Sequence, residues 1–502
     1  MKNKTIAEAL GEIDQAYIAQ AANPKRPQWV RWASAAAAIF AAVLLLQQIL
    51  QPSAPSNAIL STNPTVLGTA PAVLGRPVNI QSPDTLQLAN LVAAPTYPQM
   101  TKMPDAADYT NNLDAYDEAM KLWKADQKAH YDQPSRYADS LAGFWNRSLL
   151  QFLSGQTENA AYSPVNVYMA MAMLAETAEG NSRKQILDLF GVDSIESLRT
   201  QVNHMWNAHY SADGATTTVL GNSIWLDSAF QYKQETVDML AAKYYSSVFH
   251  GDLGTEKMNT QLQQWIDSQT GGLLQEQTQA LELDPRTLMA LASTVYFSAD
   301  WAEPFSEKNT AEAIFHGLQV DIQTQFMNQT LMHTAYYWGE DFGAIRMEMS
   351  GDNAMWLILP DMGKTVDDVL SSGEYLQMCT GTWSQWDRYT VHLSMPKFDI
   401  SGKMDLVEGM QKMGVTDVFD PAVSDFSAIT NENLFVSEIE HACRVAVDEE
   451  GCVAAAYTIM LLYGTGMPEM KDEIDFVLDR PFLFVVTSRD NLPLFAGVVN
   501  QP

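Results

Sequence analysis

The spacing of hydrophobic residues divides the chain into an early helical part and a later part rich in strands. Apolar residues at helical spacing predict helices over 113–133, 137–152 and 165–175. Strand-like segments follow at 217–225, 288–297, 354–359, 390–395 and 483–486. Early helices and later strands indicate an α+β domain built around a large sheet.

Residues 449–458 combine a hinge with a strand-like pattern. Small residues occupy every second position, so an extended chain would present them on one face: Cys452, Ala454, Ala456 and Thr458. Such a face could slide between two existing strands without clashes. Gly451 precedes the run and can absorb a large backbone rotation. From these ten residues alone, an alanine-rich turn of helix is the competing interpretation.

An apolar segment at 32–50 predicts a membrane anchor. Nineteen helical residues at ~1.5 Å each span about 28 Å, close to the hydrocarbon thickness of a bilayer. Lys25, Arg26 and Arg31 precede the segment and no basic residue follows until Arg76, so residues 1–31 should stay in the cytoplasm. Ser56 to Ala58 also suits a signal peptidase, and secretion after cleavage is the alternative.

Residues 51–111 are rich in Pro, Ala, Ser and Thr and are predicted to form a tether, with the folded domain over 112–502. The formal charge of −30, from 30 basic and 60 acidic residues, argues against a nucleic-acid partner. Three cysteines, Cys379, Cys443 and Cys452, are too few and too scattered for a disulfide framework or a zinc site. We expect no metal and no cofactor.

A search for catalytic groups finds no nucleophile with a matching base. The chain has no Gly-x-Ser-x-Gly elbow, no His-Glu-x-x-His and no Cys-x-x-Cys. Its eight histidines show no metal-ligand spacing. The sequence therefore does not predict an enzyme.

From about residue 136 onward the chain resembles the serpin family at many ordered points. The segment from Leu434 to Glu450 is similar to the region leading into the serpin hinge, with His441 and Gly451 at the family's spacing. Asp479 to Phe484 and Leu494 to Pro502 resemble the two closing strands. Further matches lie at 162–174, 180–182, 295–297, 301, 304–305, 359–360, 395–398, 413–414 and 425–427. With its apolar segment at 32–50, the chain further resembles a bacterial-type serpin with an N-terminal membrane anchor.

This resemblance implies a serpin-like fold with a large central sheet, further sheets, surrounding helices and an exposed reactive loop at about 449–475. It also implies suicide inhibition, in which a protease cleaves the loop, forms an acyl-enzyme and is displaced as the loop enters the sheet. The implied hinge comprises Glu449, Glu450, Gly451, Cys452, Val453, Ala454, Ala455, Ala456 and Thr458. The implied sheet-opening region comprises Ser163, Asn166, Ser293, Trp301, Lys397 and His441.

Counting from Glu449 by the family's spacing places the scissile bond between Thr465 and Gly466; the loop length leaves Tyr463, Gly464 and Met467 as alternatives. These residues favour elastase-like or chymotrypsin-like serine proteases, or a cysteine protease. No Arg or Lys lies between Gly451 and Met470, which argues against a trypsin-like target.

Some hinge positions depart from the family pattern. Cys452 stands where Thr or Ser is usual, Val453 where Glu is common, and Tyr457 where a small residue is typical. Ser293 replaces the family's asparagine beside His441, so the hydrogen bonds there should be rearranged. Lys397 resembles the family's strand-edge lysine that pairs with the hinge glutamate, which implies an ion pair with Glu449. We expect a monomeric inhibitor outside the cytoplasm; a non-inhibitory serpin-like binding or structural protein at the cell surface is the alternative.

Overall fold

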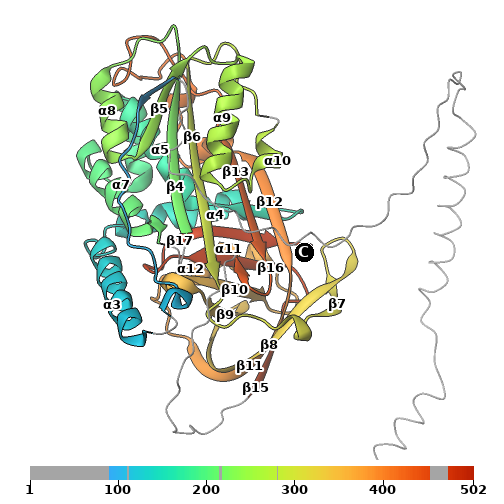
Figure 1. Cartoon of the computed structure of the whole chain (residues 1–502). Helices are drawn as coiled ribbons and strands as arrows, with labels where there is room; N and C mark the ends of the chain where they lie inside the picture. The colour runs from blue at the N-terminus through green and yellow to red at the C-terminus, as the bar shows by residue number, and fades with distance from the viewer. Residues whose placement is uncertain (1–89, 110–111, 214–216, 280, 453–472) are drawn as a thin grey trace, which may run out of the picture. The chain divides into compact units, whose positions relative to one another are not determined.

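The computed structural model describes residues 90–109, 112–213, 217–279, 281–452 and 473–502. Two large sheets and a set of helices make up this part of the chain (Figure 1), which confirms the α+β class. The predicted segments 1–31 and 32–50, most of the tether and residues 453–472 of the predicted loop lie outside it. Within the described ranges, no helix is long and apolar enough to cross a membrane.

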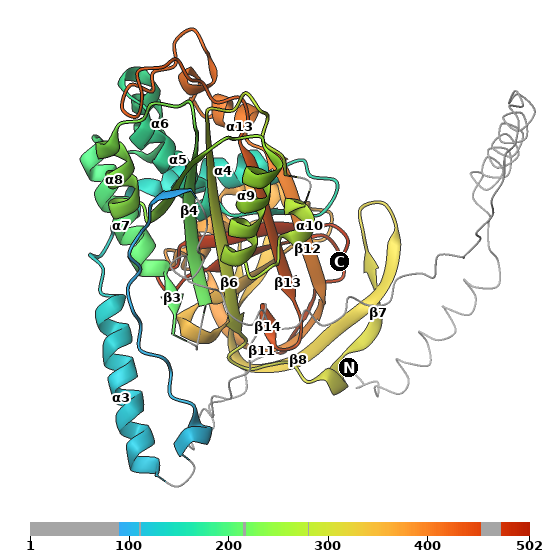
Figure 2. The same ribbon diagram turned by 45° about the horizontal axis from the view of Figure 1, so that its top comes forward.

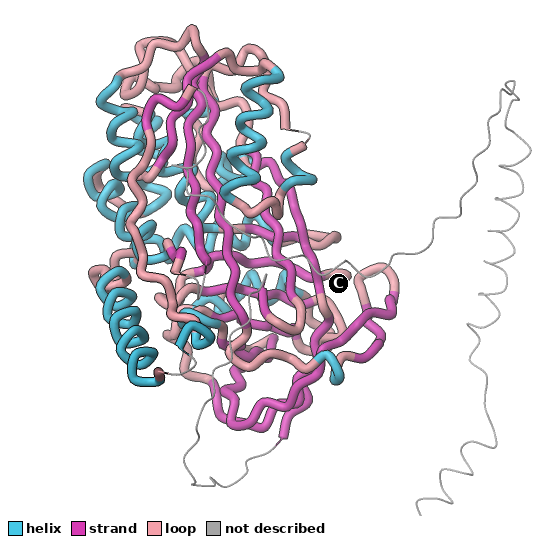
Figure 3. The backbone as a smooth tube through the Cα atoms, viewed as in Figure 1, coloured by secondary structure: helices cyan, strands magenta, loops and turns pink. Residues whose placement is uncertain are grey.

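The helices are distributed around the sheets (Figure 3). They are α3 (Leu113–His130), α4 (Ala142–Leu153), α5 (Pro164–Thr177), α6 (Gly180–Phe190), α7 (Ile195–His209), α8 (Gln234–Lys243), α9 (Glu256–Gln269), α10 (Gln275–Thr278), α11 (Val366–Ser372), α12 (Glu374–Cys379) and α13 (Val407–Lys412). Almost every residue of α5 is buried, as expected for a helix that is apolar all round. Ser163 caps α5 by accepting a hydrogen bond from the backbone of Asn166, and Pro164 starts the first turn.

The first sheet has eight strands in the order β1–β5–β4–β6–β14–β13–β12, with β3 paired to β4. Its strands are β1 (Leu91–Ala93), β3 (Ser211–Ala212), β4 (Thr217–Asp227), β5 (Ser246–Gly251), β6 (Met289–Asp300), β12 (Phe398–Asp405), β13 (Glu440–Val447) and β14 (Gly451–Cys452). Figure 2 shows the long strands β4, β6, β13 and β12 running side by side. In β13, residues alternate between buried and half-buried, the period of a strand packed on a core.

The second sheet has nine strands in the order β15–β11–β8–β9–β10–β16–β17–β2, with β7 paired to β8. They are β2 (Ala160–Tyr162), β7 (Ala311–His316), β8 (Asp321–Trp338), β9 (Phe342–Glu348), β10 (Ala354–Pro360), β11 (Trp386–Pro396), β15 (Glu473–Val477), β16 (Phe482–Thr487) and β17 (Pro493–Val499). Strands β10, β16 and β17 are buried along their whole length, which matches their nearly continuous apolar sequences.

The eight-stranded sheet is covered by helices on both faces. Helix α5 packs against β6 from the core side. On the other face, Trp265 and Ile266 of α9 pack with Trp225 of β4, and Ala290 and Ala292 of β6 border this cluster. Helix α9 is therefore attached to the β4–β6 part of the sheet.

Residues 90–109 correct part of the predicted tether. Strand β1 pairs with β5 at the edge of the eight-stranded sheet. Tyr97 is only 7% exposed and packs against the rings of Trp206 and Tyr210, with centroids 5.1 and 5.5 Å away. Trp123 of α3 donates a hydrogen bond to buried Asp213 at 3.2 Å. The folded domain therefore includes residues 90–109 and does not begin at residue 112, because Tyr97 buries its ring and Leu91–Ala93 extend the sheet.

Candidate functional site

The predicted hinge lies at a gap between two strands of the eight-stranded sheet. Strand β13 ends at Val447, and the chain turns back so that β14 runs antiparallel to both β13 and β6. Cys452 pairs with Val447 on one side and with Ala299 on the other, and Gly451 pairs with Asp300. In the described part of the chain, these two residues of β14 are what joins β6 to β13 in the sheet.

Gly451 lies against the backbone of β6. A Cβ at this position would come within 2.4 Å of the carbonyl oxygen of Ala299 and 2.7 Å of the Cα of Asp300. Its φ is not in the left-handed region. The structure therefore explains the glycine at position 451 by steric fit and not by the predicted backbone rotation. No larger residue fits where β14 enters the sheet.

The predicted ion pair between Lys397 and Glu449 is present. The Nζ of Lys397 lies 2.7 Å from Oε1 of Glu449, and the hydroxyl of Thr310 donates to the same oxygen at 2.7 Å. The Glu449 side chain is 10% exposed. Burial by itself raises the pKa of this carboxyl, but the bonds from Lys397 and Thr310 outweigh it and leave the pKa below its ordinary value.

Trp301 holds the turn that precedes β14. Its indole Nε1 donates to the carbonyl of Asp448 at 2.9 Å, and its backbone N–H donates to the carbonyl of Glu450 at 2.9 Å. The carboxylate of Asp448 accepts from the backbone N–H groups of Glu450 and Gly451. The turn is therefore bonded at each of its residues, and it fixes the direction in which the chain enters the sheet.

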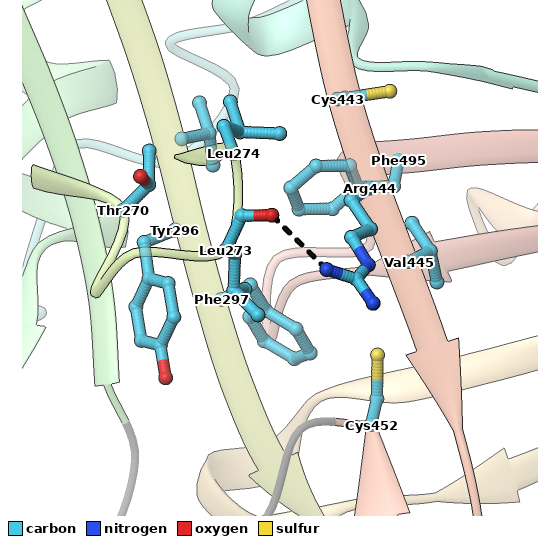
Figure 4. A pocket seen from close by; sticks show the side chains of 11 residues that line it. Thr270, Leu273, Leu274, Tyr296, Phe297, Cys443, Arg444, Val445, Cys452 and Phe495 are labelled. Atoms are coloured by element: carbon cyan, nitrogen blue, oxygen red, sulfur yellow. Dashed lines mark hydrogen bonds between the residues drawn. The ribbon is translucent and has the colours of Figure 1, made fainter. Parts of the chain in front are cut away.

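Beyond Cys452 a small cavity of about 20 Å³ lies between β6 and β13 (Figure 4). It is lined by Thr270, Leu273, Leu274, Val295, Tyr296, Phe297, Cys443, Arg444, Val445, Cys452 and Phe495. A volume of this size holds about one water molecule. The entry of further residues along the line of β14 would therefore require β6 and β13 to move apart.

Further along the gap from Cys452, the N-terminal end of α5 contacts both flanking strands, β6 and β13. The backbone N–H of Ser163 donates to Nε2 of His441 on β13 at 3.1 Å. The side-chain amide of Asn166 donates to the carbonyl of Ser293 on β6 at 2.9 Å. The hydroxyl of Ser293 donates to Asn222 of β4 at 2.9 Å, so it is directed away from His441. The N-terminal end of α5 thus connects the two strands that flank the gap.

His441 is 3% exposed, and burial lowers its pKa to about 4. It is neutral at pH 7, with Nε2 acting as acceptor and the proton on Nδ1. Burial also raises the pKa of the Cys443 and Cys452 thiols to about 12. All three cysteines are buried and free, so the structure has no disulfide.

The structure brings most of the described candidate residues into one region. Glu449, Glu450, Gly451, Cys452, Trp301 and Lys397 lie at the entrance of the gap, and Ser163, Asn166, Ser293 and His441 lie below it. Val453, Ala454, Ala455, Ala456 and Thr458, and the scissile-bond candidates Tyr463, Gly464, Thr465, Gly466 and Met467, lie outside the described residues. Sequence reasoning missed Thr310, Asp448 and Asn222, whose roles depend on tertiary contacts.

The model of the family described as "Serpin (serine protease inhibitor)" matches residues 146–502, well over half of the chain. The chain is a serpin. Alpha-1-antiproteinase 2 of Equus caballus is 27% identical over 397 residues, covering 75% of this chain and 90% of that protein. An uncharacterised serpin-like protein of Methanosarcina mazei is 26% identical over 365 residues, covering 70% of this chain and 84% of that protein.

Solved serpin structures share the fold. The thermophilic serpin tengpin in its native state has a TM-score of 0.65 at 24% identity, covering 74% of this chain and 95% of that one. The latent state of the same protein has a TM-score of 0.61 at 23% identity, covering 73% and 97%. As a serpin, the chain belongs to a family of protease inhibitors.

Proposed function

We propose that this serpin inhibits a protease as a suicide substrate, by inserting its cleaved loop between β6 and β13. The observation that carries the proposal is the geometry of β14, which already lies in the sheet with an antiparallel neighbour on each side. A strand that continued β14 would satisfy the backbone groups of both neighbours. Insertion would thus complete the sheet along its existing hydrogen-bond pattern.

The register of β14 predicts where the following residues would lie. Continued insertion would place residue 454 opposite Phe297 and Val445, and residue 456 opposite Val295 and Cys443. All four of these partner residues line the cavity. Residues 454 and 456 would therefore face the core, on the same side as Cys452. The small side chains of Ala454 and Ala456 suit such a narrow site.

Further along the same path, Thr458 would lie opposite Ser293 and His441. There its hydroxyl could hydrogen-bond with the polar groups above α5. Continued insertion from Gly451 to Thr465 would carry a tethered protease roughly 50 Å at about 3.3 Å per residue. Such a displacement would pull the catalytic serine or cysteine away from its base and its oxyanion hole, so deacylation would stop.

The test is whether the protein forms a covalent complex with a protease. We would incubate the domain with elastase-like, chymotrypsin-like and papain-like proteases and look for a complex that survives boiling in detergent. Mass spectrometry of the released C-terminal fragment identifies the cleaved bond, which we propose lies between Thr465 and Gly466. Cleavage without a complex would instead support the alternative of a non-inhibitory binding or structural protein.

A charge on the inserting face tests the insertion mechanism, and the same charge on the opposite face is the matched control. Thr458→Arg should convert the inhibitor into a substrate, because the guanidinium would be buried beside His441 without a partner. Val453→Arg places the same charge on the opposite face, next to the half-buried Ser298 and Ala446, and should leave inhibition largely intact. Equal inhibition by both variants would contradict insertion.

We also propose that the inhibitor acts outside the cytoplasm, held by residues 32–50 or released after cleavage near Ala58. The support is the length of the apolar segment and the basic residues in front of it. Fractionation of cells that express the full chain, followed by N-terminal sequencing, separates an intact anchor from a cleaved signal. Recovery of the intact chain in the cytosol would refute both alternatives.

A further inference from the structure

Arg444 occupies an unusual place in β13. It stands between the buried residues Cys443 and Val445, and its own side chain lies on the other face of the sheet. Its Nε and Nη2 donate to the two carboxylate oxygens of Asp399 on β12, at 2.8 and 2.6 Å. The two side chains are 20% and 21% exposed. Paired bonds of this kind fix the plane of the guanidinium group.

The remaining nitrogen of Arg444 points across the gap. Its Nη1 donates to the backbone carbonyl of Leu273 at 3.3 Å (Figure 4). Leu273 belongs to the segment between α9 and α10, which lines the cavity together with Thr270 and Leu274. A charged donor on β13 therefore holds a carbonyl that lies over the outer side of the cavity.

This hydrogen bond joins two parts of the sheet that insertion must separate. The Leu273 segment follows α9, which is attached to β4 and β6 through Trp265 and its neighbours. Arg444 is attached to β12 through Asp399. The bond to Leu273 thus crosses from the β12–β13 side to the β4–β6 side.

We propose that Arg444 is a latch that holds the strand gap closed and sets the rate at which the sheet opens; its role in inhibition rests on the proposed function. Continuing the register of β14 places residue 455 opposite Arg444 and Tyr296, facing the Leu273 segment. An entering strand has to displace this segment and break the contact with Leu273. The pair with Asp399 lies wholly on the other side and is kept.

The buried thiols provide a direct assay of opening. Cys443 lines the cavity, and burial raises its pKa to about 12, so alkylation requires the gap to open. Cys379, in α12 of another part of the fold, is an internal control in the same molecule. Iodoacetamide labelling of each cysteine, followed by mass spectrometry of its peptide, measures both rates at once without any protease.

Arg444→Lys is the test variant, because lysine can still pair with Asp399 but lacks the planar fork needed to hold Leu273 as well. We expect labelling of Cys443 to accelerate about three- to tenfold, as for the loss of one hydrogen bond of ordinary net strength, while labelling of Cys379 stays unchanged. Asp399→Asn, which loosens the guanidinium, should act in the same direction and more weakly. Arg388→Lys is the matched control: it removes an arginine-to-carbonyl bond to His333 on the other sheet, and Cys443 should react at the wild-type rate.

Two outcomes would overturn the latch. One is an unchanged labelling rate of Cys443 in Arg444→Lys, and the other is equal acceleration at Cys443 and Cys379, which would indicate general destabilisation. The loop-cleaved forms of wild type and variant should unfold at the same denaturant concentration, since insertion has already broken the contact. If loop cleavage leaves the heat resistance of the wild type unaltered, the proposed insertion mechanism fails, whereas labelling of the uncleaved protein still decides the latch.

Discussion

Acid should weaken this serpin through His441. The ring is buried, its pKa is lowered to about 4, and its Nε2 accepts the backbone N–H of Ser163. Protonation would place a second donor against that N–H. In the unfolded chain the same imidazole titrates near its ordinary pKa of 6.5. The free energy of unfolding should therefore fall as the pH drops from 6.5 towards 4.

The magnitude follows from the two pKa values. Between pH 7.5 and pH 5 the unfolded state gains nearly one proton at this residue and the folded state gains almost none. The free energy of unfolding should fall by about 2 kcal/mol over this range, with a limit of about 3.4 kcal/mol well below pH 4. Glu449 has a lowered pKa, so its contribution to the free energy of unfolding is lost only below pH 4.5, the ordinary pKa of a glutamate. Buried His209 also has a lowered pKa, so His441 is isolated only by the difference between wild type and a His441 variant over the interval from pH 7.5 to 5.

His441→Gln is the variant for the assay, because its side-chain oxygen can accept the Ser163 bond and does not titrate. Urea unfolding followed by tryptophan fluorescence at pH 7.5 and pH 5 gives the loss for each protein. We expect wild type to lose about 2 kcal/mol more than the variant. His392, an exposed histidine paired with Glu473, provides a control position in His392→Gln. An identical acid dependence of wild type and His441→Gln would refute the reasoning.

Two further predictions concern the entrance of the gap. Lys397→Met leaves the buried carboxylate of Glu449 with Thr310 as its remaining side-chain partner, and should lower the melting temperature of the uncleaved form by an amount equivalent to about 1–2 kcal/mol; an unchanged melting curve would contradict this. Gly451→Ala places a Cβ against the carbonyl of Ala299, so insertion should fail. Detergent gels should show loop cleavage without a complex, and a complex at the wild-type yield would disprove the steric argument.

The sequence predicted the regular elements of the fold well. The strand expected at 217–225 corresponds to β4, and that at 390–395 to the C-terminal half of β11. The helix expected at 113–133 corresponds to α3. Each of these elements has apolar residues at regular spacing, and this spacing can be recognised within the sequence of the element alone. The tether was wrong over residues 90–109, because Trp206, the partner of Tyr97 on α7, lies more than a hundred positions away.

The sequence predicted those contacts of the candidate site that belong to recognisable motifs. It did not predict those that depend on tertiary packing. Lys397 and Glu449 were paired correctly from the sequence, whereas the direction of the Ser293 hydroxyl depends on Asn222 in a neighbouring strand. Arg444 gave a signal that was not used: a charged residue interrupts the apolar pattern of a strand that is otherwise half buried. Its partners, Leu273 and Asp399, become visible only when the sheet is assembled.

The contacts that hold the gap closed differ in kind along the path of an entering strand. At the entrance stands the Lys397–Glu449 ion pair, in the middle the charged bond from Arg444, and at the far end the neutral bond between Ser163 and His441. Salt screens the ion pair, whose Lys397 side chain is 33% exposed, more than the neutral bond between Ser163 and His441, whereas acid above pH 5 acts on His441 alone of these. If opening starts at the entrance, salt should accelerate labelling of Cys452 before that of Cys443. If it starts above α5, mild acid should accelerate labelling of Cys443 first.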